Sequence, residues 1–316
     1  MAASDIHNSD IEEHIKKNRP HLKANSISTY RNAIKKVYKL CDFPTGVDAT
    51  YSLLYTNPKK VIETLQRIPA NVRKTYYAAL VVYCGDKDKT ALKMYSSEMR
   101  DDISSYTKEQ ATNRKSDQQK ENWLTWPEVL QVVETLRKKV IPLWKETSLT
   151  KAEYNLLQSY ILVSCYTMIP PRRASDYINL KYRNDSELDN FYNAKKGQML
   201  FRIYKTAKVY GTQEETVPKI LKTLLNKWIN KKDSLTGGLA NVAKSDYIFN
   251  GPGGKKFSNG DITNTLNYIF DKRISVSMLR HIFITDKLSP KIEELKAIAG
   301  DMGHSVAQQA LYVKKD

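Results

Sequence analysis

The C-terminal segment 277–316 contains three side-chain types that can act on a phosphate group. Arg280 lies in a predicted helix, His304 follows Gly303, and Tyr312 comes shortly afterwards. A guanidinium can bind two phosphate oxygens at once, an imidazole can donate a further hydrogen bond, and a phenol can attack phosphorus to form an ester. The segment therefore predicts phosphoryl-transfer chemistry, with the rest of the chain delivering the phosphate.

Two further cations precede this segment. Arg172 and Arg173 directly follow the prolines at 170–171. Because two prolines cannot continue a helix, both arginines are expected at a sharp turn before the next element. Residues 199–204 are the best strand prediction, and the chain is expected to turn back toward 215–218 as a hairpin. That hairpin would carry Lys205 and Lys208 at its tip.

The remaining elements are predicted to be mainly helical. Thr125 stands three residues before Glu128, a capping box that should begin a helix. Residues 151–168 have the apolar content of a long, largely buried helix. We therefore predict a mainly α fold with a small β-sheet, in which the second domain is of the α+β class.

The chain is predicted to contain two domains. Residues 1–107 contain several short helical patterns and are expected to form an all-helical domain. Segment 108–122 lacks large apolar residues and is the best linker candidate. Residues 123–316 would form the second domain, in line with a length that exceeds one average domain.

Composition favours a polyanionic partner. The formal net charge is +17, from 51 Lys and Arg against 34 Asp and Glu. Three separated cysteines (Cys41, Cys84 and Cys165) suggest buried thiols in a reducing compartment, without a metal site or disulfide framework. No signal peptide and no long apolar run are readable, so we expect an intracellular protein located at DNA and not in a membrane.

Basic residues on the predicted helices suit contacts with the backbone of a DNA duplex. The alternative is that each of them simply lies on a solvated face. The candidates are Arg31, Lys35, Lys36, Arg73 and Lys74 in the first domain, together with Lys208 at the hairpin tip.

Taken in order, these motifs resemble those of the tyrosine recombinases, the family that includes the phage integrases. The matching positions are Arg173 with Asp176, Lys205, Leu279-Arg280-His281, Met302-Gly303-His304-Ser305 and Tyr312. The resemblance is specific over residues 123–316. Over residues 1–110 it rests only on a basic helical module in the expected place.

The resemblance implies a site-specific recombinase or integrase of a mobile element or DNA virus. Arg173 and Arg280 would hold the scissile phosphate, with His304 as a further donor. Tyr312 would attack to leave a 3′-phosphotyrosine, and Lys205 would protonate the leaving 5′-oxygen. The family needs no metal or other cofactor and no small-molecule substrate, and it acts as a homo-tetramer on double-stranded DNA. Relaxation of DNA by a topoisomerase IB-like enzyme, resolution of hairpin telomeres, and DNA binding without catalysis are the alternatives.

Three points remain open within the resemblance. The family usually has His or Lys three residues before its second arginine, and this chain has Ser277. Ser277 is either the N-cap of its helix or a hydroxyl that binds the phosphate. Arg172 competes with Arg173, although the interval to Asp176 favours Arg173. Only four residues follow Tyr312, so either any exchange of an element between copies uses another part of the chain, or the natural chain continues beyond residue 316.

Overall fold

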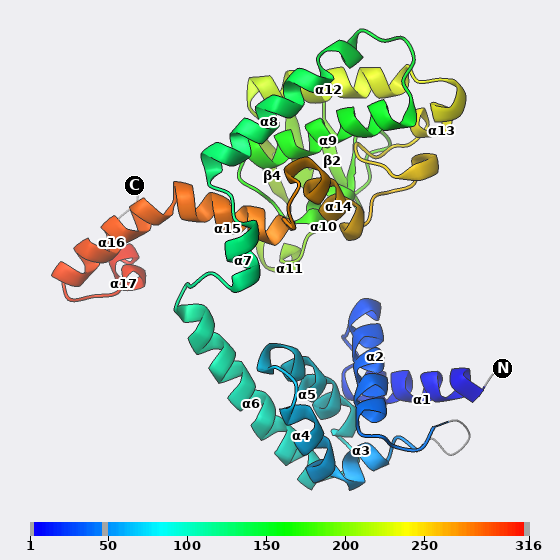
Figure 1. Ribbon diagram of the computed structural model, residues 1–316, viewed down its shortest axis with the longest axis vertical. Helices are drawn as coiled ribbons and strands as arrows, with labels where there is room; N and C mark the ends of the chain where they lie inside the picture. Colours follow the sequence, from blue (N-terminus) through cyan, green and yellow to red (C-terminus); the bar gives the residue numbers. More distant parts are fainter. Residues whose placement is uncertain (1–2, 46–49, 313–316) are drawn as a thin grey trace. The chain divides into compact units, whose positions relative to one another are not determined.

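The computed structural model describes residues 3–45 and 50–312 (Figure 1). The chain divides into two compact units, residues 1–115 and 116–316, and the division falls inside the predicted linker 108–122. The described residues are mainly helical, with one small mixed sheet in the second unit, which confirms the predicted mainly α composition.

The N-terminal unit is built from helices in the described part of the chain. They are α1 (Ala3–Asn18), α2 (Ala24–Leu40), α3 (Leu53–Thr56), α4 (Pro58–Gln66), α5 (Ala70–Cys84) and α6 (Lys89–Ala111). Buried apolar side chains from these helices, such as Ile15, Ile34 and Leu80, form one core. Asp102 is buried beside it and forms an ion pair of 2.6 Å with Arg73, which fastens α6 to α5.

The predicted linker is mostly helical. Helix α6 continues to Ala111, and α7 (Asp117–Asn122) begins at a capping box between Ser116 and Gln119. Its Gln, Lys and Glu residues are good helix formers, so a segment without large apolar residues can be helical without being buried. The composition of 108–122 therefore indicated exposure and not an absence of structure.

The C-terminal unit surrounds a four-stranded sheet with helices. Its longer helices are α8 (Trp126–Val140), α9 (Lys151–Thr167), α12 (Lys219–Asp233), α14 (Asn259–Phe270), α15 (Val276–Lys287) and α16 (Ser289–Asp301). Its shorter helices are α10 (Ala174–Ile178), α11 (Ala207–Tyr210), α13 (Ala240–Ala243) and α17 (Val306–Ala310), with 3₁₀ turns at 142–144, 237–239 and 252–254. The predicted capping box of Thr125 and Glu128 begins α8, and α9 is buried along most of its length, as expected.

The strands are β1 (Leu180–Lys181), β2 (Asn190–Asn193), β3 (Gln198–Phe201) and β4 (Gln213–Thr216), in spatial order β1-β2-β3-β4. Strand β1 is parallel to β2, and the other two pairings are antiparallel. The β3–β4 pairing, in which Phe201 faces Gln213, confirms the predicted hairpin.

Strand β3 ends at Phe201, before the predicted end at residue 204. The reason is the buried side chain of Asn190. Its Oδ1 accepts hydrogen bonds of 2.8 Å from the backbone amides of both Arg202 and Ile203. Those amides are satisfied without a sheet partner, so the chain leaves the ladder and forms α11 before β4.

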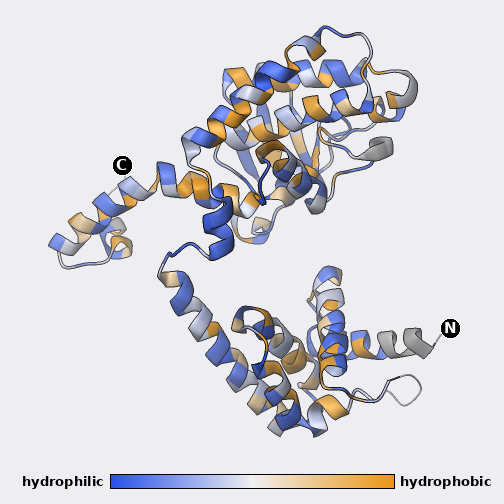
Figure 2. Cartoon of the chain, in the orientation of Figure 1, coloured by the Kyte–Doolittle hydropathy of each residue, from blue (hydrophilic) through white to orange (hydrophobic). Residues whose placement is uncertain are grey.

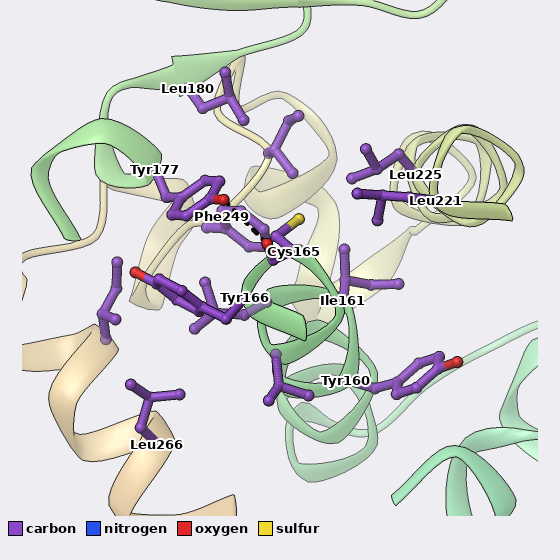
Figure 3. Close-up of a cluster of buried hydrophobic side chains, with 14 of the residues drawn as sticks. Tyr160, Ile161, Cys165, Tyr166, Tyr177, Leu180, Leu221, Leu225, Phe249 and Leu266 are labelled. Carbon is purple, nitrogen blue, oxygen red and sulfur yellow. Dashed lines mark hydrogen bonds between the residues drawn. The ribbon is translucent and has the colours of Figure 1, made fainter. Parts of the chain in front are cut away.

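Aromatic packing joins α10 to the core of this unit (Figure 3). The Tyr177 hydroxyl donates a 3.1 Å hydrogen bond to the Cys165 carbonyl on α9, and its ring meets Tyr166 and Phe249 edge-on. This packing fixes the short helix that follows the two prolines. All three cysteines are buried free thiols, as predicted.

Among the described residues, no helix is both long enough and apolar enough to cross a membrane.

Lys232 is fully buried in the C-terminal unit. The Lys232 Nζ donates to the carbonyls of Ser245, at 3.0 Å, and Tyr247, and it lies 4.8 Å from the ring centre of Tyr182. Burial lowers its pKa to about 7. In the unfolded chain a lysine titrates near ~10.4. Between these values the unfolded chain binds more protons than the folded one, so the stability contributed by this site rises with pH.

We therefore compare the unfolding free energies of the wild type and of Lys232→Met. The difference, wild type minus variant, should increase between about pH 7 and pH 10. The limiting slope for one proton is about 1.4 kcal/mol per pH unit. Urea unfolding at several pH values measures it. Lys219→Met, an exposed position on the same helix, is the control and should give a flat difference. A flat difference for Lys232→Met would show that its charge does not change on folding.

Candidate functional site

A pocket of about 310 Å³ lies beside α10 in the C-terminal unit. The turn that follows α9, the β3–α11 connection, strand β4 and helix α15 all contribute to its lining. Its polar and charged lining residues are Arg172, Arg173, Asp176, Tyr204, Thr206, Tyr210, Gln213, Glu215 and Arg280. The structure thus brings together both predicted phosphate-binding arginines, which are far apart in the sequence.

Arg172 is held within the protein. Its Nε lies 3.2 Å from the buried carboxylate of Asp176, and its Nη2 donates to the side chain of Gln213 at 2.9 Å. Its guanidinium also lies over the Phe201 ring, 3.8 Å from the ring centre. The Arg172 guanidinium is therefore fully occupied by contacts with Asp176, Gln213 and Phe201. These contacts join α10 to the hairpin.

Arg173 and Arg280 differ from Arg172. Neither forms a side-chain hydrogen bond or an ion pair within the described residues, yet both line the pocket. Arg173 is the N-cap residue of α10 and has the extended backbone angles typical of that position. Arg280 lies in the second turn of α15. Two uncompensated guanidiniums in one pocket form an anion site suited to phosphate oxygens.

A buried tyrosine lies behind these arginines. Tyr166 is completely buried, and its hydroxyl has no hydrogen-bond partner in the described part of the chain. Burial raises its pKa well above the ordinary value, Cys165 and Asp176 raise it further, and Arg280 opposes the rise. Tyr166 therefore stays neutral and adds no negative charge to the site.

The lysine positions lie at the edge of the pocket. Lys205 is exposed and stands between Tyr204 and Thr206, both of which line the pocket, although Lys205 does not line it in this structure. Lys208 is exposed on α11. Of the two, Lys205 has pocket-lining residues on both sides, so it is the better placed to reach a bound phosphate.

The interpretation of Ser277 as an N-cap is wrong. Helix α15 is capped by Ser275, whose hydroxyl accepts a 3.2 Å hydrogen bond from the amide of Met278. Ser277 lies in the first turn, is exposed and does not line the pocket. Its predicted contact with phosphate stays a prediction.

His304 and Tyr312 lie together, but outside the pocket. Gly303 has a positive φ of 71°, and the His304 amide bonds to the Ala299 carbonyl at 2.9 Å, which ends α16. Ser305 then caps α17, and the His304 and Tyr312 rings approach to 5.4 Å between centres. The Tyr312 side chain is exposed. The predicted active-site residues are therefore divided between two places in this structure.

Sequence reasoning missed several lining residues. Gln213 orients Arg172, the Tyr204 hydroxyl donates to the Gly211 carbonyl at 2.7 Å, and the exposed Tyr210 brings a second tyrosine to the pocket. Tyr210 could have been noticed as an aromatic in the lysine-bearing connection. Gln213 carries no such signal, because its role depends on tertiary packing.

The predicted DNA-binding residues of the N-terminal unit differ in their surroundings. Arg31 pairs with Glu12 at 2.6 Å, and Arg73 pairs with buried Asp102. Lys74 lies over the ring of Tyr106, 3.0 Å from its centre. Lys35 is half-buried and Lys36 is exposed, and neither has an ion-pair or hydrogen-bond partner among the described residues. These two lysines on α2 keep their full charge for an external partner.

Comparisons with protein-family models, with curated proteins and with solved structures found no match to this chain.

The two neighbouring arginines should respond differently to substitution. Arg172→Ala leaves the buried Asp176 carboxylate unpaired and should lower the unfolding free energy by about 3 kcal/mol. Arg173→Ala removes no internal partner and should change it by less than about 0.5 kcal/mol. Urea unfolding of both variants makes the comparison. Equal losses would contradict this division between a structural and a ligand-binding arginine.

Proposed function

We propose that this protein cleaves and rejoins DNA strands by the chemistry of the tyrosine recombinases, as a site-specific recombinase or integrase. One observation carries the proposal. Arg173 and Arg280, separated by most of the C-terminal unit in the sequence, meet in one pocket, and neither charge has a partner among the described residues. These are the two positions that the sequence motifs assign to the phosphate.

The pocket supports a stepwise mechanism. Arg173 and Arg280 bind the non-bridging oxygens of a phosphodiester and stabilise the negative charge that builds up during attack. The Tyr312 hydroxyl releases its proton to solvent as its oxygen forms a bond to phosphorus. The bond to the 5′-oxygen breaks, and Lys205 gives a proton to that oxygen. The products are a 3′-phosphotyrosyl ester and a free 5′-hydroxyl. Attack by a 5′-hydroxyl on the ester reverses these steps and rejoins the DNA.

The charge distribution supports DNA as the partner. The net charge of +17 favours association with a polyanion. In the N-terminal unit, Lys35 and Lys36 on α2 could contact the DNA backbone, and we propose that this helical unit clamps the duplex. Exchange between two duplexes requires four active sites, so the active form would be a tetramer on DNA.

A non-catalytic DNA-binding protein is the second candidate. The observation that favours it is the position of Tyr312. This residue follows the C-terminal end of α17 and does not line the arginine pocket. In that case Arg173 and Arg280 would bind a backbone phosphate without cleaving it.

The nucleophile assignment predicts the result of one gel assay. With a nicked duplex, whose cleaved end diffuses away, the wild type should accumulate covalent protein–DNA adducts. Tyr312→Phe should form none while binding the same DNA, because it lacks the attacking oxygen. Tyr268→Phe, an exposed tyrosine of the same unit, is the control and should react normally. Adducts that persist in Tyr312→Phe would refute the assignment.

The leaving-group assignment has its own test. Lys205→Ala should cleave an ordinary substrate at least ~100-fold more slowly, the usual scale of general acid catalysis. A 5′-bridging phosphorothiolate, whose sulfur leaves without protonation, should restore its cleavage rate. Lys208→Ala on the same connection should respond equally to both substrates. A Lys205→Ala defect that remains with the sulfur leaving group would contradict this role.

A further inference from the structure

A second pocket, larger than the arginine pocket, lies in the C-terminal unit. Its volume is about 620 Å³, inside the range of ~300–1,000 Å³ that small-molecule sites occupy. The first half of α9, helix α14 and two segments, 238–242 and 250–257, line it. It shares no lining residue with the arginine pocket, so the proposed DNA cleavage does not account for it.

Three buried polar side chains hold the floor of this pocket in one arrangement. The Tyr154 hydroxyl donates to Asn250 Oδ1 at 2.6 Å. The Gln158 side chain pairs with the Asn250 backbone, donating to its carbonyl at 3.0 Å and accepting from its amide at 2.9 Å. The Nδ2 of Asn250 is buried and has no hydrogen-bond partner in the described part of the chain. An unpaired buried donor is costly, and a small shift of the floor would let an acceptor on a ligand pair with it.

Three asparagine side chains stand above this floor. Asn155 comes from α9, Asn241 from α13 and Asn264 from α14, and all three are exposed lining residues. None of their side-chain amides has a hydrogen-bond partner among the described residues. Figure 2 shows that α9 carries hydrophilic positions among its hydrophobic ones. Each planar amide offers a donor and an acceptor side by side. We call this site the asparagine pocket.

One wall of the asparagine pocket is closed tightly against α13. Gly254 has a φ of 77°, and a Cβ at this position would lie 2.3 Å from the Asn241 carbonyl oxygen. Glycine permits both this backbone conformation and this close approach. The Gly251 amide also donates to the Lys255 carbonyl at 2.7 Å, which holds the turn. The backbone that carries Asn241 is therefore fixed without a ligand.

The asparagine pocket carries little charge, although the chain as a whole is strongly basic. Its charged lining residues are Lys151 and Asp261. The Asp261 carboxylate accepts hydrogen bonds from the amide and the hydroxyl of Ser258, at 2.7 and 2.8 Å, and so serves to cap α14. Lys151 is exposed and has no ion pair among the residues that the structure describes. Buried Phe257 and Val242 add apolar surface to the lining.

This combination of groups fits a nucleotide with an adenine base. An asparagine side chain can form two hydrogen bonds with the N6 and N7 edge of adenine. Apolar and aromatic side chains provide surface for the faces of a base. One lysine suits a single phosphate group, whereas a site for a phosphate alone would need more cationic groups than this pocket has.

We propose that the asparagine pocket binds an adenine nucleotide. The base is hydrogen-bonded by Asn155 and Asn264, and Lys151 binds the phosphate. The same chemistry recognises a free nucleotide and an unpaired adenine nucleotide of a DNA strand. This inference does not rest on the proposed function, because the two pockets have no residue in common.

Titration calorimetry of the full chain tests the proposal with three probes: dAMP, dTMP and deoxyribose 5-phosphate. We expect saturable binding of dAMP that is at least about tenfold tighter than that of dTMP, because thymine lacks the N6 and N7 edge. Deoxyribose 5-phosphate, which has no base, should not bind measurably. Equal binding of dAMP and dTMP, or no binding of dAMP, would overturn the proposal.

Variants locate the bound nucleotide. Asn155→Leu and Asn264→Leu should each weaken dAMP binding at least about tenfold. Asn259→Leu, exposed on the same helix as Asn264 but outside the pocket, is the matched control and should bind normally. Lys151→Met should remove the preference for dAMP over deoxyadenosine. Loss of dAMP binding in Arg173→Ala would place the ligand in the arginine pocket and contradict the assignment.

A DNA probe separates the two sources of the nucleotide. If the ligand is part of DNA, a duplex with one extrahelical adenine should bind at least about tenfold more tightly than the fully paired duplex. Asn264→Leu should abolish that gain, and Asn259→Leu should keep it. If dAMP binds as predicted but the extrahelical adenine gives no gain, the ligand is the free nucleotide. A gain that persists in Asn264→Leu would show that another surface binds the base.

Discussion

The pairing of Arg172 with the buried carboxylate of Asp176 is the interaction on which the candidate site depends. Asp176 lies on α10. The next residue, Tyr177, is buried in the core and hydrogen-bonds to α9. An unpaired carboxylate at that depth would be strongly destabilising, so a cation has to face it. Arg172 meets that requirement and, through Gln213, ties the turn to the hairpin. The next residue, Arg173, then lines the pocket and has no side-chain partner in the part of the chain that the structure describes.

This division has a chemical consequence. An arginine that is fully engaged by protein groups cannot rearrange to follow a developing charge, whereas an unpaired one can bind both oxygens of a phosphate. In the proposed mechanism the chain uses consecutive arginines for the two tasks, Arg172 for structure and Arg173 for the ligand. The same distinction applies to the overall charge, since Arg31 and Arg73 are matched by carboxylates and the net excess has to lie elsewhere.

Local features of the sequence predicted much of the fold. The Thr125–Glu128 box, the buried helix α9 and the hairpin all follow from residue patterns within a few positions of each other. Features that depend on tertiary packing could not be predicted from these local patterns. The side chain of Asn190, on the neighbouring strand β2, ends strand β3 by binding backbone amides that follow it. Polar helix formers made a helical segment look like a linker.

The site was predictable in composition but not in arrangement. Motif order placed Arg173 and Arg280 in one pocket, and the structure agrees. Motif order could not reveal that α15 carries Tyr312 away from that pocket, because sequence spacing does not show the direction in which a helix leaves the core. The structure also brings Tyr210 to the pocket, which makes it a physical rival as nucleophile.

The most direct measurement is to map the covalent attachment. The wild type, trapped on the nicked duplex, would be digested with nuclease and trypsin, and the nucleotide-bearing peptide identified by mass spectrometry. The account predicts attachment to the peptide 297–314, in which Tyr312 is the sole tyrosine. Attachment at Tyr210, or the absence of any nucleotide-bearing peptide, would contradict it.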